Sequence, residues 1–257
     1  MSIHYNVADG IARMVIDRPE RKGALDADMR VAMVEYVEAA AVDDAVRVLV
    51  IEGTQGNFCS GADLGQFSGE TIASSRQRMR RGGLRLARAI WEMEKPVVAS
   101  VGGPAIGLGW AIALVCDQIV VARSARFAFT QANISLVPDC GAAYMLVRHL
   151  GLLRAKSLLF SGRMVGAQEA FDLGLASDLV DDDALADHVA ALAQRLAAGP
   201  TFALGMTKHL LHQALGPSLA DFLELETMIA PQLRFTEDFK EGTSAFREKR
   251  KPQFKGY

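Results

Sequence analysis

The chain has 257 residues, of which 50% are hydrophobic and 23% charged, and its formal net charge is −2. This composition predicts one large soluble domain, or one with a small appendage, and excludes extensive disorder. The weakly acidic balance argues against a general nucleic-acid-binding protein, because such domains are usually basic.

The first half of the chain predicts strands that alternate with helices. Residues 1–10 lack the charged segment and apolar run of a secretory signal, so a cytoplasmic protein is expected. Apolar residues recur at intervals of three and four over 25–40, which is the pattern of one helix face. We expect strands at 11–17 and 46–51, a glycine-rich loop at 56–61, and an arginine-rich helix that ends at Glu94.

Residues 96–116 contain no charged side chain and approach the length of a membrane-spanning helix. Two prolines and four glycines divide this stretch, so we interpret it as a buried strand at 97–101, a turn, and a buried helix at 107–116. Short strands are expected at 119–122 and 127–129, and helices at 141–150, 184–198, 201–215, 218–229 and 237–249. The sequence thus predicts an α/β body at 1–195 and an all-helical region at 196–257.

Two glycine-rich turns follow predicted strands, at 57–64 and at 102–111. In the first turn, Gly61 permits a sharp bend that aims the amide of Ala62 into a cleft. The alternative interpretation is an ordinary strand-to-helix turn in which Asp63 caps the helix. The second cannot be a dinucleotide-binding G-x-G-x-x-G, because Ile112 stands at the last glycine position. It is either a helix start with accessible amides or a site of close helix packing.

Five segments, in this order, are similar to segments of the crotonase (enoyl-CoA hydratase/isomerase) family. They are Asp17-Arg18-Pro19-Glu20, Phe58-Cys59-Ser60-Gly61-Ala62-Asp63-Leu64, Lys95-Pro96-Val97-Val98-Ala99, Gly107-Leu108-Gly109 and Phe246-Arg247-Glu248-Lys249-Arg250-Lys251-Pro252. The resemblance covers nearly the whole chain and implies a ββα superhelical core followed by a helical trimerisation region. It also implies a homotrimer or a dimer of trimers that acts on an acyl-CoA thioester and needs no metal or redox cofactor.

In this family two backbone amides hold the thioester oxygen, and the resemblance assigns them to Ala62 and Leu108. It further assigns acyl-CoA contacts to residues of these turns and of the loop before the first predicted helix: Lys22, Ala24, Ser60, Asp63, Leu64 and Gly107. Gly23 stands where the family commonly has asparagine.

The two glutamates with which hydratases of the family activate water correspond, in this resemblance, to Ala111 and Asn133. Asn133 can hold a water or a carbonyl, but neither residue can serve as a base, so ordinary hydratase activity should be very weak. Several isomerases of the family, including epoxyphenylacetyl-CoA isomerases, carry an acid at the position of Asp139. The resemblance therefore favours an enoyl-CoA isomerase with Asp139 as its single base. The alternatives are that Asp139 only caps a helix, that the protein is a hydratase, or that it binds acyl-CoA without catalysis.

Four arginines of one predicted helix, Arg78, Arg81, Arg85 and Arg88, would share a face. A solvated face or a subunit contact is the simpler interpretation of this cluster, and a clamp for CoA phosphates is the alternative. The three cysteines are odd in number, and no third metal ligand is evident beside His209 and His212. Neither a disulfide framework nor a metal site is therefore expected.

Overall fold

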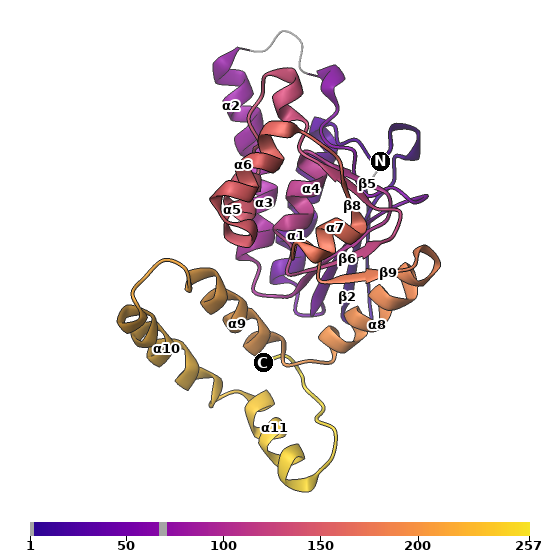
Figure 1. Cartoon of the computed structure of the whole chain (residues 1–257). Coiled ribbons are helices and arrows are strands. Elements are labelled where there is room, and N and C mark those ends of the chain that lie inside the picture. The colour runs from indigo at the N-terminus through magenta and orange to yellow at the C-terminus, as the bar shows by residue number, and fades with distance from the viewer. Residues whose placement is uncertain (1–2, 67–70) are drawn as a thin grey trace.

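A six-stranded sheet forms the centre of the chain that the computed structural model describes, residues 3–66 and 71–257 (Figure 1). Its strands, in spatial order, are β1 (Ile3–Ala8), β2 (Ile11–Ile16), β3 (Val48–Gly53), β4 (Val97–Val101), β6 (Gln118–Ala122) and β9 (Asp178–Val180). A hairpin through Asp9 and Gly10, both at positive φ, makes β1 antiparallel to β2. All later neighbours in this sheet are parallel. A smaller sheet has the order β5 (Pro104–Ile106), β7 (Arg126–Ala128), β8 (Val165–Gly166).

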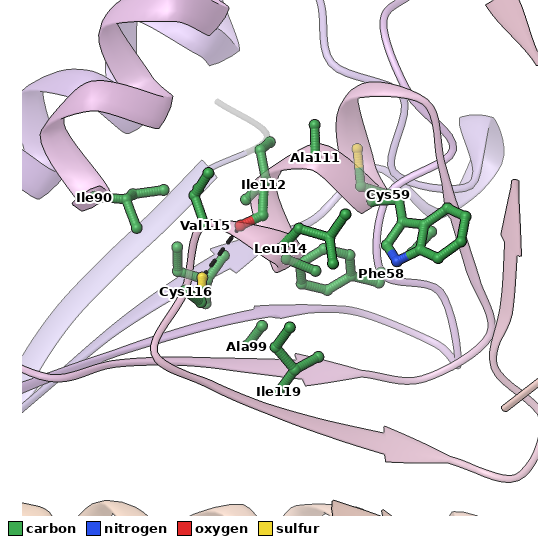
Figure 2. Close-up of a cluster of buried hydrophobic side chains, with 14 of the residues drawn as sticks. Phe58, Cys59, Ile90, Ala99, Ala111, Ile112, Leu114, Val115, Cys116 and Ile119 are labelled. Carbon is green, nitrogen blue, oxygen red and sulfur yellow. Dashed lines mark hydrogen bonds between the residues drawn. The ribbon is translucent and has the colours of Figure 1, made fainter. Parts of the chain in front are cut away.

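Helices cover both faces of the central sheet. Leu49 and Ile51 of β3 belong to a large core shared with α1 (Ala27–Val42), α3 (Gly83–Glu92) and α4 (Leu108–Leu114). The alternating residues Val48 and Val50 pack instead with α8 (Leu185–Ala197) on the other face. Burial on both faces explains why the strand is a nearly continuous apolar run in the sequence. Figure 2 shows the part of the larger core that surrounds α4, a helix whose residues are all buried.

The remaining helices complete the body and form the C-terminal region. The body also contains α2 (Ile72–Arg81), α5 (Ala142–Leu150), α6 (Leu152–Ser161) and α7 (Ala167–Asp172). Short 3₁₀ helices lie at Pro19–Arg21, Leu64–Gln66, Gln131–Ile134 and Asp182–Ala184. The last three helices, α9 (Thr201–Gln213), α10 (Leu219–Leu233) and α11 (Glu237–Glu248), extend away from the sheet at the lower side of Figure 1.

Two sets of polar contacts fix the C-terminal region to the body. The buried Lys208 of α9 donates to Asp117 at 2.9 Å and to the carbonyl oxygen of Ile90 at 3.0 Å. Arg47 donates to Thr201 Oγ1 at 3.0 Å and to the carbonyl oxygen of Phe254 at 2.9 Å, which holds the end of the chain beside the start of α9. By contrast, α10 buries no residue, although it carries apolar side chains such as Leu219, Leu223 and Met228.

The expected α/β class is confirmed, and so is the division of residues 96–116 into a strand, a turn and a helix. No helix in the described part of the chain is long and apolar enough to cross a membrane. The expected arginine-rich helix is instead two helices, because the chain breaks at Gly82 between α2 and α3. The expected boundary at residue 195 lies inside α8, which packs on the sheet, and the extended helices begin at Thr201.

Candidate active site

A cavity of about 630 Å³ lies where both glycine-rich turns meet the segment 130–140, the helices α2 and α3, and one side chain of α1. We call it the site cavity. Six residues singled out from the sequence line it: Ser60, Ala62, Leu64, Gly107, Leu108 and Asp139. The helices add Arg30, Arg78 and Gly83, and the segment 130–140 adds Gln131, three apolar side chains and Cys140.

Two glycines at positive φ lie where the two turns meet. Gly61 has φ of 106°, and Gly107 has φ of 53° and ψ of −112°, which side chains with a Cβ rarely adopt. A Cβ on Gly61 would lie 2.9 Å from the carbonyl oxygen of Ile106 and 3.9 Å from the amide nitrogen of Leu108. The backbone at Gly61 therefore lies directly against the start of α4.

Ala62 and Leu108, whose amides were singled out from the sequence, both line the site cavity. Within the described residues, neither the amide of Ala62 nor that of Leu108 donates to a backbone acceptor. Leu108 is the first residue of α4, where amides have no acceptor inside the helix. A pair of converging amides can stabilise a developing negative charge on an oxygen atom. The other interpretation of the second turn, close helix packing, holds for Gly109. A Cβ on Gly109 would lie 2.1 Å from the carbonyl oxygen of Cys59.

The side chain of Asp139 lines the site cavity and does not cap the following helix. The N-cap of α5 is Gly141, which makes no side-chain capping bond, and the amide of Ala142 donates to the backbone oxygen of Asp139 at 3.0 Å. Burial raises the pKa of Asp139, and the Cys140 thiol and the guanidinium groups of Arg30 and Arg78 oppose this effect in part. A cavity-lining carboxyl group of raised pKa is suited to proton transfer.

Arg30 is a cavity residue that the sequence did not reveal. It lies on α1, only 6% exposed, and burial and the nearby Arg78 lower its pKa. It shares one row of α1 with the buried Val34 and Val37, at spacings of four and three. This spacing could have identified Arg30 from the sequence, because a charged residue in line with buried positions must face the interior or a cavity.

The amide that faces the site cavity belongs to Gln131 and not to Asn133, which corrects the placement expected from the sequence. Gln131 lines the cavity, and its Oε1 atom is buried without a hydrogen-bond partner in the part of the chain that the structure describes. Asn133 is exposed, and a Cβ on Gly162 would lie 3.1 Å from its Oδ1. Both residues belong to one 3₁₀ helix, in which side chains two positions apart point in different directions.

Ala111, the other position at which the resemblance implies a hydratase glutamate, lies in the core. It is buried within α4 and does not line the site cavity (Figure 2). Asp139 is therefore the only carboxylic acid among the described residues that line this cavity.

Lys22, Ala24 and Asp63 lie outside the cavity lining, in loops joined to it. The backbone oxygen of the exposed Lys22 accepts the Ser60 amide at 3.0 Å. Arg18 binds the Ala24 carbonyl and the Asp63 carboxylate, both at 3.0 Å. Asp63 also accepts the Gly65 amide at 3.1 Å, so its contacts here are structural. Lys22 keeps an exposed cationic side chain on a loop that is tied to the cavity edge.

The arginine cluster divides between different environments. Arg78 lines the site cavity, whereas Arg85 binds Glu38 and Arg88 binds Glu92 on the surface. Because α2 ends at Arg81, the four arginines do not form one continuous helix face.

The remaining candidate ligands form no metal site. In the described residues, no group of three histidines, cysteines or acids is arranged to hold a metal ion. His212 stacks on Trp91, and burial and neighbouring cationic residues lower its pKa to about 4. Cys59, Cys116 and Cys140 are buried free thiols.

A family model described as enoyl-CoA hydratase/isomerase matches residues 6–257. The chain belongs to this family. It is 34% identical to a 1,2-epoxyphenylacetyl-CoA isomerase of Escherichia coli (strain K12), over 98% of this chain and 97% of the relative. It is 33% identical to a 2,3-dehydroadipyl-CoA hydratase of the same organism, over 95% and 94%. The crystal structure of an enoyl-CoA hydratase from Bacillus anthracis matches with a TM-score of 0.94 at 26% identity, covering all of both chains. Isomerases and hydratases are thus similar to this chain to nearly the same degree, and family membership leaves the reaction open.

Proposed function

We propose that the protein is an enoyl-CoA isomerase that moves a double bond along the acyl group of a CoA thioester. The observation that supports this proposal is the environment of Asp139. Its carboxyl group lines the site cavity, is released from helix capping, and is the only acid among the described lining residues. A reaction with one proton donor and acceptor fits such a site better than one that needs two.

In the proposed mechanism, the thioester oxygen lies between the amides of Ala62 and Leu108. Asp139 takes a proton from Cα of a 3-enoyl thioester, and the C–H electron pair moves toward the carbonyl to give a dienolate. The protonated Asp139 then returns the proton to Cγ, which leaves the double bond between Cα and Cβ and restores the carbonyl. A well-placed oxyanion donor stabilises such a transition state by about 3–4 kcal/mol.

Hydration is the second candidate, and Gln131 supports it. Its Oε1, which has no partner among the described residues, could accept a hydrogen bond from a water that Asp139 deprotonates. A panel of 2-enoyl-, 3-enoyl- and ring-epoxide-CoA substrates followed by mass spectrometry separates the candidates, because isomerisation conserves mass and hydration adds one water. If no substrate of the panel reacts, the non-catalytic acyl-CoA-binding alternative gains support.

We also propose that the CoA moiety extends past the loop of Lys22 and that α10 serves in a trimer or a dimer of trimers. The first proposal is supported by the exposed lysine beside Ser60. The second is supported by α10, which buries no residue and exposes the apolar side chains of Leu219, Leu223 and Met228.

A further inference from the structure

The Arg30 guanidinium belongs to a buried residue that lines the site cavity. No carboxylate within residues 3–66 and 71–257 forms an ion pair with it. Asp26, one turn earlier on the chain, caps α1 through the Met29 amide at 2.9 Å and lies 3.6 Å from Arg18. A buried guanidinium without a carboxylate partner is costly, so a ligand that supplies an anion would bind favourably there.

Arg30 lies beside the glycines at the break between α2 and α3. A Cβ on Gly82 would lie 3.6 Å from Arg30 Nε, so the guanidinium lies against the break between α2 and α3. A Cβ on the adjacent Gly83 would lie 2.6 Å from Cys140 Sγ and 3.4 Å from Leu108 Cδ1. Gly82 and Gly83 thus lie between the Arg30 guanidinium on one side and the side chains of Leu108 and Cys140 on the other.

Both a cationic group and acidic groups lie near Arg30. Arg78 lies near it, and the acids that influence it are Asp26 and Asp139, with the Cys140 thiol. Asp26 is already engaged with Arg18 and the α1 amide. Apolar side chains such as Leu84 and Val137 also line the site cavity, which suits an apolar acyl chain.

We propose that Arg30 binds a carboxylate at the far end of the acyl group, so that the preferred substrates are CoA thioesters of dicarboxylic acids. The planar guanidinium matches a carboxylate with two parallel hydrogen bonds. A methyl-terminated chain would bury the same guanidinium without a partner. This inference rests on the proposed function only in assuming that the acyl group occupies the site cavity.

Calorimetric titration with saturated acyl-CoA thioesters tests the inference independently of the reaction, because saturated chains have no double bond to move. Methyl-terminated thioesters of four to eight carbons are each paired with the ω-carboxyl thioester of equal length. We expect the best ω-carboxyl thioester to bind about 10- to 100-fold more tightly than its methyl partner. Arg30→Met should abolish this ratio, and Arg30→Lys should retain only part of it, since lysine keeps the charge without the planar fork.

Arg88→Met is the matched control, because it removes the same charge from a side chain that is 75% exposed and paired with Glu92. It should leave the ratio unchanged. Equal affinity for both members of every pair, or an equal loss for both in Arg30→Met, would overturn the inference. If Arg30→Met fails to fold, the wild-type ratio and the Arg30→Lys ratio decide. A carboxylate preference in a protein that isomerises nothing would retain the inference and refute the proposed function.

Discussion

Replacing Asp139 by asparagine separates catalysis from structure at this position. The side chain makes no capping bond to α5, and the bond from the Ala142 amide uses the backbone oxygen, which asparagine keeps. The usual cost of about 1 kcal/mol for losing a helix cap therefore does not apply. The variant should fold, and it should retain the shape of the site cavity.

The catalytic effect of Asp139→Asn should be large. The substitution removes the only acid among the described residues that line the cavity, and a positioned base contributes about 10²–10⁴-fold. This factor corresponds to about 2.7–5.4 kcal/mol in the activation free energy. The assay follows the positional isomers of an enoyl-CoA substrate, while calorimetry with a saturated acyl-CoA confirms that binding persists. A well-folded variant that retains most of the isomerase rate would refute the assignment of Asp139 as the base.

The pH dependence provides a second test of the same residue. Because burial raises the pKa of Asp139, kcat/KM of the wild type should rise with pH at values above the ordinary carboxyl range of about 4. A folded-state pKa above the unfolded value contributes stability that is complete below the unfolded pKa and is lost as pH rises through the folded pKa. The rise of kcat/KM with pH should therefore be absent in Asp139→Asn. The variant should also be at least as stable as the wild type at neutral pH. An Asp139→Asn protein that is clearly less stable at neutral pH would contradict the burial argument.

Three further expectations concern the CoA loop, the C-terminal anchor and the assembly. Lys22→Ala should raise KM for acyl-CoA more than it lowers kcat, and acyl-pantetheine, which lacks the nucleotide, should reveal no effect of this substitution. Lys208→Met should lower the free energy of unfolding by about 3–5 kcal/mol in urea titrations, because it leaves Asp117 buried without its cation. The control Lys240→Met, at an exposed ion pair, should lower it by less than about 1 kcal/mol. Light scattering at micromolar concentration should give the mass of a trimer or a hexamer; a monomeric mass would exclude a role of α10 in assembly.

The strands and turns of the body follow from local sequence patterns. β4 is an apolar run bounded by proline and glycines, and its predicted bounds agree with the structure. β1 lies at the edge of the sheet, where only Ile3 is fully buried, so its apolar pattern was too weak to predict. The hairpin at Asp9 and Gly10 carried a recognisable signal, because this residue pair favours positive φ at both positions.

The site was predictable where backbone conformation determines it and less so where packing does. Gly61 and Gly107 mark turns whose amides are exposed by local geometry, so sequence reasoning could identify them. The direction of Gln131 depends on how one 3₁₀ turn lies on the cavity, and a shift of two positions selected Asn133 instead. Arg30 reaches the cavity only because α1 packs beside the break at Gly82, a contact between distant segments.

The distinction between backbone and side-chain contributions also explains why the family does not determine the reaction. The two amides of the proposed oxyanion site depend on chain conformation, so other sequences with this fold can keep such amides while the chemistry changes. Three side chains differ in what they can contribute: Asp139 can transfer a proton, Gln131 can accept a hydrogen bond, and Arg30 can pair with an anion. If the acyl group occupies this cavity as proposed, its position relative to Arg30 also sets which carbon lies against Asp139. Contacts at the end of the acyl group then determine which carbon reacts. Substitutions at Arg30 should therefore change the ratio of products as well as the affinity for the substrate.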